Sequence, residues 1–274
     1  FKAAVVGAGT MGGQIAQTIA AAGVPVVLKD ISQELIDHGL TAAREATAAA
    51  LAGQVKKGKL TEEQAAQQVD EIVARITGTL DYDGFGDVDF VIEAVPERIE
   101  IKQAVFAELD AVTPGHAILA SNTSSLSITE IGEATLRPDK VVGFHYFYPA
   151  SLMPLIEVIE SDDTSQETIT AAATFAQAIR KQPIICGEVP GFVVNRVLIS
   201  GVSEVLREQE RRGLDIGQID AALTERKLVP MGPFVLLNLL GLDVFQHTAE
   251  HLHESYGDRF YVADGIGELV AAGK

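Results

Sequence analysis

The sequence predicts an α/β fold in which a mostly parallel sheet is followed by an all-helical second domain. Short apolar runs alternate with helical patterns from Lys2 to Cys186, which is typical of a parallel sheet with crossover helices. A Pro-Gly-Phe break follows at 190–192, and helical patterns continue beyond it. We therefore predict one domain at 1–188 and a helical domain at 189–274.

The first apolar run leads directly into a glycine-rich turn. Lys2–Val6 has the pattern of a strand, Gly7-Ala8-Gly9-Thr10-Met11-Gly12 follows, and a helical pattern then extends to about Ala22. In such a turn the first glycine permits the tight bend, the second lets a pyrophosphate approach the backbone, and the third lets the helix pack closely. The N–H groups at the start of the helix attract phosphate.

A second strand, Val24–Leu28, ends in Lys29-Asp30. Asp30 lies 23 residues after Gly7, near the spacing at which a carboxylate binds a ribose 2′-OH. A 2′-phosphate would be repelled there. Strand, turn, helix, strand and acid together predict a Rossmann-type domain that binds NAD rather than NADP. A glycine-rich turn without a ligand is the alternative.

Two helices are predicted within residues 32–76. Ser32 is the expected N-cap of the first, and Thr61 with Gln64 forms a capping box on the second. Between them, the segment Gln54–Lys59 carries three lysines in an otherwise acidic chain. These lysines either contact an anionic ligand, such as the phosphates of coenzyme A, or form a solvated tip.

Three later strands each lead into polar residues. Their apolar runs are Val88–Ala94, Ala117–Ala120 and Val141–Phe144. Glu97 follows the first run, the small polar segment 121–125 (Ser-Asn-Thr-Ser-Ser) the second, and His145 the third. Because ligands of open α/β sheets bind at the carboxyl ends of strands, we expect a cofactor's ribose and nicotinamide at this edge. A helix cap is the alternative for the polar segment, although Ser127 can serve as that cap alone.

A histidine and a carboxylate stand on either side of a predicted turn. Pro149 and Pro154 interrupt regular pairing after His145, so the chain can bring Glu157, inside the run Leu155–Ile159, back beside the imidazole. A buried carboxylate needs a partner, and an imidazole held by a carboxylate is a general base near neutral pH. A structural ion pair is the alternative, but the position beside the expected nicotinamide favours a catalytic pair.

The remainder of the chain is predicted to be mainly helical. The expected elements are a helix at 164–180, a strand at 182–186, and helices at 193–212, 215–226 and 231–240. Asn195 lies near the start of the long helix, where it either donates hydrogen bonds to a substrate carbonyl or caps the helix. His247 and His251 have metal-like spacing, but no third ligand is suggested, so no metal site is predicted.

Composition excludes several classes of function. A net charge of −17 over 274 residues argues against a nucleic-acid surface. The single cysteine, Cys186, cannot form an intramolecular disulfide, which fits a reducing, cytoplasmic setting. No run of about 18 apolar residues predicts a membrane span. The chain starts at Phe1 directly in a strand pattern, which is typical of an excised or processed segment.

Taken together, these motifs resemble the 3-hydroxyacyl-CoA dehydrogenase family along nearly the whole chain. The matching motifs are GAGTMG at 7–12, Asp30, IEAVPE at 92–97, SNTSS at 121–125, GFH at 143–145, IEVI at 156–159 and PGFVVNR at 190–196. The segment 79–95 is especially similar to the dehydrogenase part of bacterial multifunctional fatty-acid oxidation proteins, in which an enoyl-CoA hydratase domain precedes it. The resemblance implies an acyl-CoA substrate, a role in β-oxidation, and a homodimer or a place in a larger multifunctional chain.

The resemblance also implies roles for individual residues. His145 would take the proton from the substrate 3-hydroxyl, and Glu157 would orient it and stabilise its imidazolium. Ser124 would hydrogen-bond the reacting oxygen, and Asn195 would help to bind that oxygen or the thioester carbonyl. Glu97 and Lys102 match family positions that contact the cofactor. The expected NAD-binding residues are Gly7, Gly9, Thr10, Met11, Gly12, Asp30, Glu97, Lys102, Asn122 and Ser124.

The chain departs from the family pattern at three places. Tyr148 stands where the family usually has an asparagine after His-Phe-Phe. Ala46 and Gly53 stand where the family has a serine and a lysine for coenzyme A, and the chain ends at Lys274, before the family's C-terminal Gly/Lys-rich motif, so we expect a truncated helical domain. Two alternatives remain open: a β-hydroxy acid dehydrogenase on the same plan, and a non-catalytic NAD-binding relative.

Overall fold

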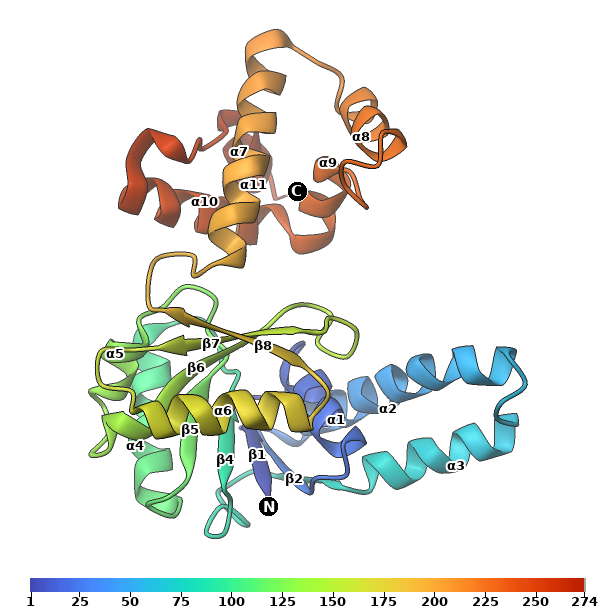
Figure 1. The fold of residues 1–274 in the computed structure, drawn as a ribbon, viewed down its shortest axis with the longest axis vertical. Coiled ribbons are helices and arrows are strands. Elements are labelled where there is room, and N and C mark those ends of the chain that lie inside the picture. The colour runs from blue at the N-terminus through green and yellow to red at the C-terminus, as the bar shows by residue number, and fades with distance from the viewer. Residues whose placement is uncertain (274) are drawn as a thin grey trace. The chain divides into compact units, whose positions relative to one another are not determined.

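The structure, a computed structural model, describes residues 1–273. By its internal contacts the chain divides into two compact units, Phe1–Glu188 and Val189–Lys274. Figure 1 shows a sheet with surrounding helices in the first unit, whereas the described part of the second unit consists of helices and the segments that join them. This architecture confirms the predicted fold class.

The first unit is built on one eight-stranded sheet with the order β3-β2-β1-β4-β5-β6-β7-β8. The strands are β1 (Ala3–Val6), β2 (Val26–Lys29), β3 (Ile76–Thr79), β4 (Phe90–Glu93), β5 (Ile118–Ser121), β6 (Val141–Tyr146), β7 (Leu155–Glu160) and β8 (Gln182–Gly187). Every pair of neighbours is parallel except β6 and β7, which are antiparallel. The carboxyl ends of β1, β4, β5 and β6 therefore share one edge, which we call the active-site edge.

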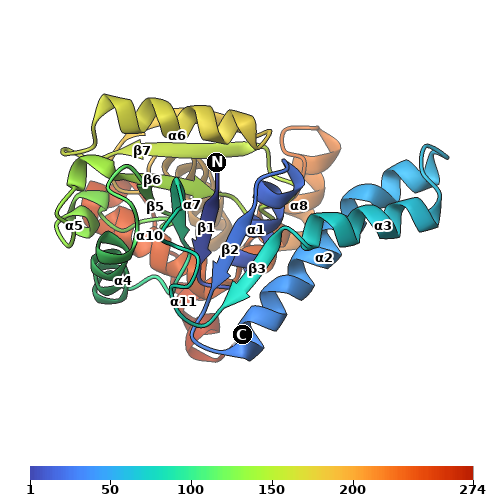
Figure 2. The ribbon, with the colours of Figure 1, turned by 90° about the horizontal axis from the view of Figure 1, so that it is seen from below.

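Several helices of the first unit begin at caps that the sequence predicts. Those of the first unit are α1 (Gly12–Ala21), α2 (Gln33–Lys56), α3 (Glu62–Val73), α4 (Ile99–Val112), α5 (Ile128–Gly132), the 3₁₀ helix Pro138–Lys140, and α6 (Gln166–Ala178). Ser32 accepts from the N–H of Leu35, and Thr61 forms the predicted capping box with Gln64. The helices α2 and α3 lie side by side as a long hairpin (Figures 1 and 2).

An aromatic cluster joins the sheet to α6. The ring of Phe175 from α6 lies 4.5 Å from Phe90 of β4 and 6.0 Å from Phe144 of β6, measured between centroids. The same buried cluster includes Ile15 and Ile19 of α1, so α1 and α6 share one core against the sheet. Fully burying each of these side chains stabilises the fold by about 1.5–3 kcal/mol. This core fixes the start of α1 and the end of β6 relative to each other.

One strand, β3, is missing from the sequence prediction, which placed residues 32–76 in helices and made 88–94 the third strand. Ile76–Thr79 is short, lies at the edge of the sheet, and has two exposed residues, so it lacks a clear apolar pattern. Gly78 lies in its interior because a Cβ there would approach the Ile36 side chain to 2.4 Å. Close packing of α2 on the sheet therefore explains a glycine that weakens the strand pattern.

The second unit has its own apolar core. Its helices are α7 (Val194–Arg212), α8 (Ile216–Glu225), α9 (Pro233–Leu240), α10 (Leu242–Tyr256), the 3₁₀ helix Gly257–Arg259, and α11 (Asp264–Ala271). Ile199 and Leu206 of α7 pack with Leu237 of α9 and Leu252 of α10 in one buried cluster. Asp215 caps α8, as predicted. No helix within residues 1–273 is long and apolar enough to span a bilayer.

Two glycines of the first turn should differ in their tolerance of a methyl group. A Cβ at Gly12 would lie 1.6 Å from the carbonyl oxygen of Gly7, whereas a Cβ at Gly9 would meet nothing within 4 Å. Gly12→Ala should therefore lower the free energy of unfolding by about 1–3 kcal/mol or more, because the backbone must shift. Gly9→Ala should leave it within about 0.5 kcal/mol. Urea unfolding of both variants checks this, and equal stability of the two would contradict the geometry.

Candidate active site

The glycine turn at the end of β1 forms a cradle suited to a pyrophosphate. Gly7 adopts a positive φ of 99°, and a Cβ there would come within 2.5 Å of the Ala94 carbonyl oxygen. The start of α1 has no side-chain cap at Met11 and no acidic residue in its first turn. Its N–H groups thus have no side chain competing with a phosphate for them, and the open space around Gly9 lets a phosphate approach the backbone. The turn therefore fits the cofactor predicted from its sequence.

Asp30 lies at the end of β2, where its carboxylate is fixed by two backbone groups. The N–H of Ala8, inside the glycine turn, donates to Oδ2 at 2.5 Å, and the N–H of Ile31 donates to Oδ1 at 2.6 Å. A carboxylate held beside the glycine turn accepts from a ribose hydroxyl and repels a 2′-phosphate. Thr10 and Met11 complete the turn, the first exposed and the second half-buried.

The central pair of the site is His145 and Glu157. The two residues lie directly opposite each other in the antiparallel pairing of β6 and β7. Nδ1 of His145 lies 2.8 Å from Oε2 of Glu157, and the side chains are 8% and 0% exposed. The ring of Phe147 packs against the imidazole, with 4.6 Å between centroids. The predicted turn therefore does bring the carboxylate to the imidazole, with Nδ1 directed at Glu157.

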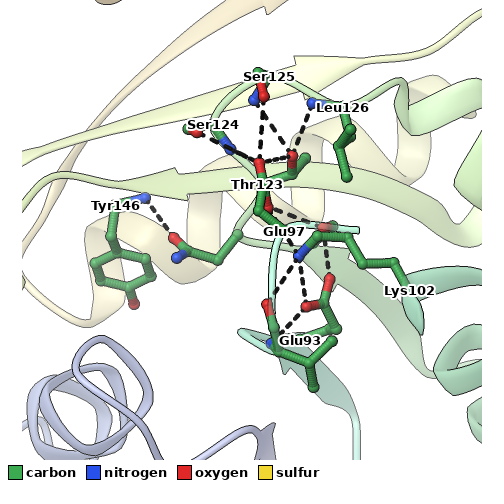
Figure 3. A network of polar contacts seen from close by, with 11 residues as sticks. Glu93, Glu97, Lys102, Thr123, Ser124, Ser125, Leu126 and Tyr146 are labelled. Atoms are coloured by element: carbon green, nitrogen blue, oxygen red, sulfur yellow. Dashed lines mark hydrogen bonds and ion pairs between the residues drawn. The ribbon is translucent and has the colours of Figure 1, made fainter. Parts of the chain in front are cut away.

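Glu97 organises the loop that carries Ser124 (Figure 3). Its Oε1 accepts from the hydroxyl of Thr123 at 2.5 Å and from the N–H of Ser124 at 2.8 Å, with longer contacts to the hydroxyls of Ser124 at 3.3 Å and Ser125 at 3.5 Å. These bonds join the loop after β4 to the loop after β5. The two loops therefore form one polar surface at the active-site edge.

Behind Glu97 lies a buried lysine shared by two carboxylates. The ammonium nitrogen of Lys102, from α4, lies 2.7 Å from Oε1 of Glu93 and 3.2 Å from Oε2 of Glu97. Both Lys102 and Glu93 are essentially inaccessible, and Glu93 also accepts from the hydroxyl of Ser121 at 2.7 Å. Lys102 thus lies beneath Glu97, and in this structure it acts on the surface of the site through that carboxylate.

The contacts around Glu97 keep it ionised. Burial raises the pKa of Glu97, but the charge of Lys102 and the hydrogen bonds from Thr123, Ser124 and Lys102 outweigh burial, so its pKa lies below the usual range. An ionised Glu97 is acceptor-only, and it therefore holds the hydroxyl and N–H groups of the loop in donating orientations.

The remaining predicted residues lie in different parts of the molecule. The side-chain oxygen of Asn122 accepts from the N–H of Tyr146 at 2.9 Å, which ties the end of β5 to the end of β6. Asn195 lies in the first turn of α7, within the second unit. The lysines at the tip of the α2–α3 hairpin are exposed. In residues 1–273 no group of His, Cys, Asp or Glu side chains is arranged to hold a metal ion.

The sequence interpretation gave no individual role to three members of the polar network: Glu93, and Ser121 and Thr123, which were predicted only as part of the polar segment 121–125. Glu93 carries the clearest signal, because a charged residue within the apolar run Val88–Ala94 requires a buried partner. Its partner, Lys102, lies nine residues later on α4, and neither the helix nor the strand period relates two residues at that separation.

Family comparisons match both units. The NAD-binding domain of 3-hydroxyacyl-CoA dehydrogenase matches residues 2–189, and the C-terminal domain of the same family matches residues 191–274. The chain belongs to the 3-hydroxyacyl-CoA dehydrogenase family. The matched NAD-binding domain contains the glycine turn, Asp30 and the His–Glu pair, and NAD is accordingly the cofactor.

Individual members of the family show how much of a protein this chain represents. The alpha subunit of the fatty acid oxidation complex of Pseudomonas savastanoi is 41% identical over 258 residues, which is 94% of this chain and 34% of that subunit. The corresponding subunit of Acinetobacter baylyi is 42% identical over 260 residues, 94% of this chain and 35% of that subunit. The chain spans about a third of the length of these curated relatives.

Solved structures of the family superpose closely. An (S)-3-hydroxybutyryl-CoA dehydrogenase from Ralstonia eutropha has a TM-score of 0.88 at 35% identity, covering 99% of this chain and 94% of that chain. A 3-hydroxybutyryl-CoA dehydrogenase from Escherichia coli has a TM-score of 0.87 at 37% identity, covering 99% of this chain and 56% of that chain. These matches confirm the resemblance inferred from the motifs.

Glu97 should give stability a recognisable dependence on pH. Its pKa is lower in the folded chain than the ordinary 4.5, so its contribution is present above pH 4.5 and is lost as the pH falls through the folded pKa. The difference in free energy of unfolding between wild type and Glu97→Gln should therefore be largest at neutral pH and shrink below about pH 4.5.

Urea unfolding of both proteins between pH 7 and pH 3 measures this difference. Glu100→Gln is the matched control, because the Glu100 carboxylate is exposed and its ion pair with Arg98, which is also exposed, is long at 3.8 Å. A Glu97 difference that stays constant over the whole range would contradict the network in Figure 3.

Proposed function

We propose that this chain catalyses the NAD-dependent oxidation of L-3-hydroxyacyl-CoA to 3-oxoacyl-CoA, a step of fatty-acid β-oxidation. The observation that carries the proposal is the buried contact of 2.8 Å between His145 and Glu157, at the same edge of the sheet as the glycine turn. A dehydrogenase of this kind needs a base for the hydroxyl proton beside the acceptor of the hydride.

In the proposed reaction the protein moves a proton and positions the substrate. Bound NAD supplies the hydride acceptor at C4 of its nicotinamide. Nε2 of His145 removes the proton of the 3-hydroxyl as the carbonyl forms, and the carboxylate of Glu157 holds the ring and stabilises the imidazolium. Ser124 hydrogen-bonds the reacting oxygen, and Asn195 contributes a further hydrogen bond to that oxygen or to the thioester carbonyl.

The cofactor residues have complementary roles in this proposal. Gly7, Gly9 and Gly12 shape the turn, and the backbone N–H groups of Thr10 and Met11 bind the pyrophosphate. Asp30 binds the adenosine ribose. Glu97, Asn122 and Ser124 form the polar surface for the nicotinamide side of the cofactor, and Lys102 supports Glu97 from below.

The proposal extends to partners and location. Exposed apolar side chains of the second unit, among them Val197, Val235, Leu239 and Val244, support a homodimer or contact with further parts of a multifunctional chain. The length of the fatty acid oxidation subunits favours the multifunctional arrangement. A single cysteine among 274 residues and an acyl-CoA substrate support a cytoplasmic setting.

One assay tests the function: formation of NADH from L-3-hydroxybutyryl-CoA and from longer 3-hydroxyacyl-CoA thioesters. His145→Ala should lower kcat by about 10²–10⁴-fold, because it removes the general base. Glu157→Gln should lower kcat as well, since it keeps a hydrogen-bond partner but not the charge. His116→Ala is the matched control, because His116 is exposed and precedes β5 at the opposite edge.

The outcomes separate the alternatives left open by the sequence. Turnover of thioesters that is lost in His145→Ala supports the proposal. Turnover of free β-hydroxy acids without turnover of thioesters would make the chain a dehydrogenase of another substrate class. NAD binding without any turnover would make it a non-catalytic relative, for which Tyr148 in place of the usual asparagine is the supporting feature.

A further inference from the structure

A second buried lysine, outside the network around Glu97, has a different kind of partner. Lys181 lies between α6 and β8 and is 8% exposed. Its ammonium group donates to the carbonyl oxygen of Ala150 at 2.5 Å and to that of Met153 at 2.8 Å. Among residues 1–273 it forms no ion pair with a carboxylate, unlike Lys102, and its burial lowers its pKa.

A buried cation without a counter-ion is costly, and here the two carbonyl oxygens supply the compensating hydrogen bonds. Both carbonyls belong to the segment 147–154, the loop that joins β6 to β7. The loop therefore connects the strand of His145 to the strand of Glu157. Its first residue, Phe147, packs against the imidazole of His145, and its second, Tyr148, is 46% exposed.

Other contacts of the loop are mostly internal or lie at its end. The N–H groups of Leu152 and Met153 both donate to the carbonyl oxygen of Pro149 at 3.0 Å, within the loop itself. The N–H of Ser151 reaches Gln14 of α1 only at 3.5 Å, and the carbonyl oxygen of Pro154 accepts from the N–H of Gln182 as β8 begins. Lys181 therefore provides the two shortest bonds between the middle of the loop and the rest of the unit.

We propose that Lys181 is a positioning residue for the reaction: by binding the carbonyls of Ala150 and Met153 it fixes the 147–154 loop, and through Phe147 it fixes the imidazole of His145. This inference rests on the proposed function, since it concerns the rate of the same proton transfer. The ammonium group of Lys181 binds the two carbonyls and lies 6.0 Å from the ring centroid of Tyr146, a weaker contact, so we assign its main effect to the loop.

The test is steady-state oxidation of L-3-hydroxybutyryl-CoA by wild type and by Lys181→Met, together with NADH affinity from fluorescence titration. The methionine has a similar volume but no donor, so the loop loses both bonds while the core stays filled. We expect kcat to fall by about 10–100-fold, because small displacements of a catalytic group have effects of this size, while NADH affinity stays within about twofold. Lys140→Met, which removes only a long 3.8 Å ion pair to Glu167, is the matched control.

A double variant distinguishes positioning from a general loss of structure. If Lys181 acts through Phe147, then Lys181→Met and Phe147→Ala share one effect, and the double variant should be no slower than the slower single variant. The inference would be overturned if the losses in kcat of the two single variants multiplied in the double variant. It would also be overturned if Lys181→Met had the kcat and KM of wild type. Should Lys181→Met not fold, Lys181→Leu replaces it, since leucine also lacks a donor, and the same criteria apply.

The two proposals fail in distinguishable ways. If wild type forms no NADH from any 3-hydroxyacyl-CoA, the proposed function is wrong and the role of Lys181 in it is wrong as well. If wild type turns over and His145→Ala does not, but Lys181→Met behaves like Lys140→Met, only the positioning role is wrong.

Discussion

The active site depends on the register of a single antiparallel strand pair. β6 and β7 place residues 145 and 157 directly opposite each other, and both side chains then point to the same face of the sheet. A slip of one residue would turn Glu157 to the other face and leave a buried carboxylate without its imidazole. Because an unpaired buried charge costs several kcal/mol, the register and the His–Glu contact stabilise each other.

A second constraint acts on the neighbouring loops. Glu93 and Lys102 are buried beside each other, and Lys102 also holds Glu97, which lies a third exposed above them. The group contains two carboxylates and one ammonium, so the surface it presents carries negative charge, although the site must also accept an anionic cofactor. The local N–H groups of the glycine turn, rather than the net charge of the chain, therefore remain the predicted site for the phosphates.

Much of this arrangement could be predicted from the sequence, because local rules govern it. The glycine turn, the caps at Ser32, Thr61 and Asp215, and the return of Glu157 to His145 all follow from short-range patterns of sterics and hydrogen bonding. The strand β3 could not be predicted, since its four residues lie at the sheet edge and do not alternate between buried and exposed. The partners of Glu93 and Lys181 could not be predicted either, because they depend on tertiary packing. The roles of Ser124 and Asn195 rest on the family resemblance and stay predictions.

The position of Asp30 has a consequence for redesign of the cofactor preference. Its carboxylate both faces the expected ribose site and accepts from the N–H of Ala8, which lies inside the glycine turn. Replacing it with a neutral or basic side chain, to admit a phosphorylated dinucleotide, would also remove the acceptor of the Ala8 N–H within the turn. The same carboxylate therefore bears on the choice of cofactor and on the shape of the glycine turn. A switch of coenzyme thus requires another acceptor for the Ala8 N–H.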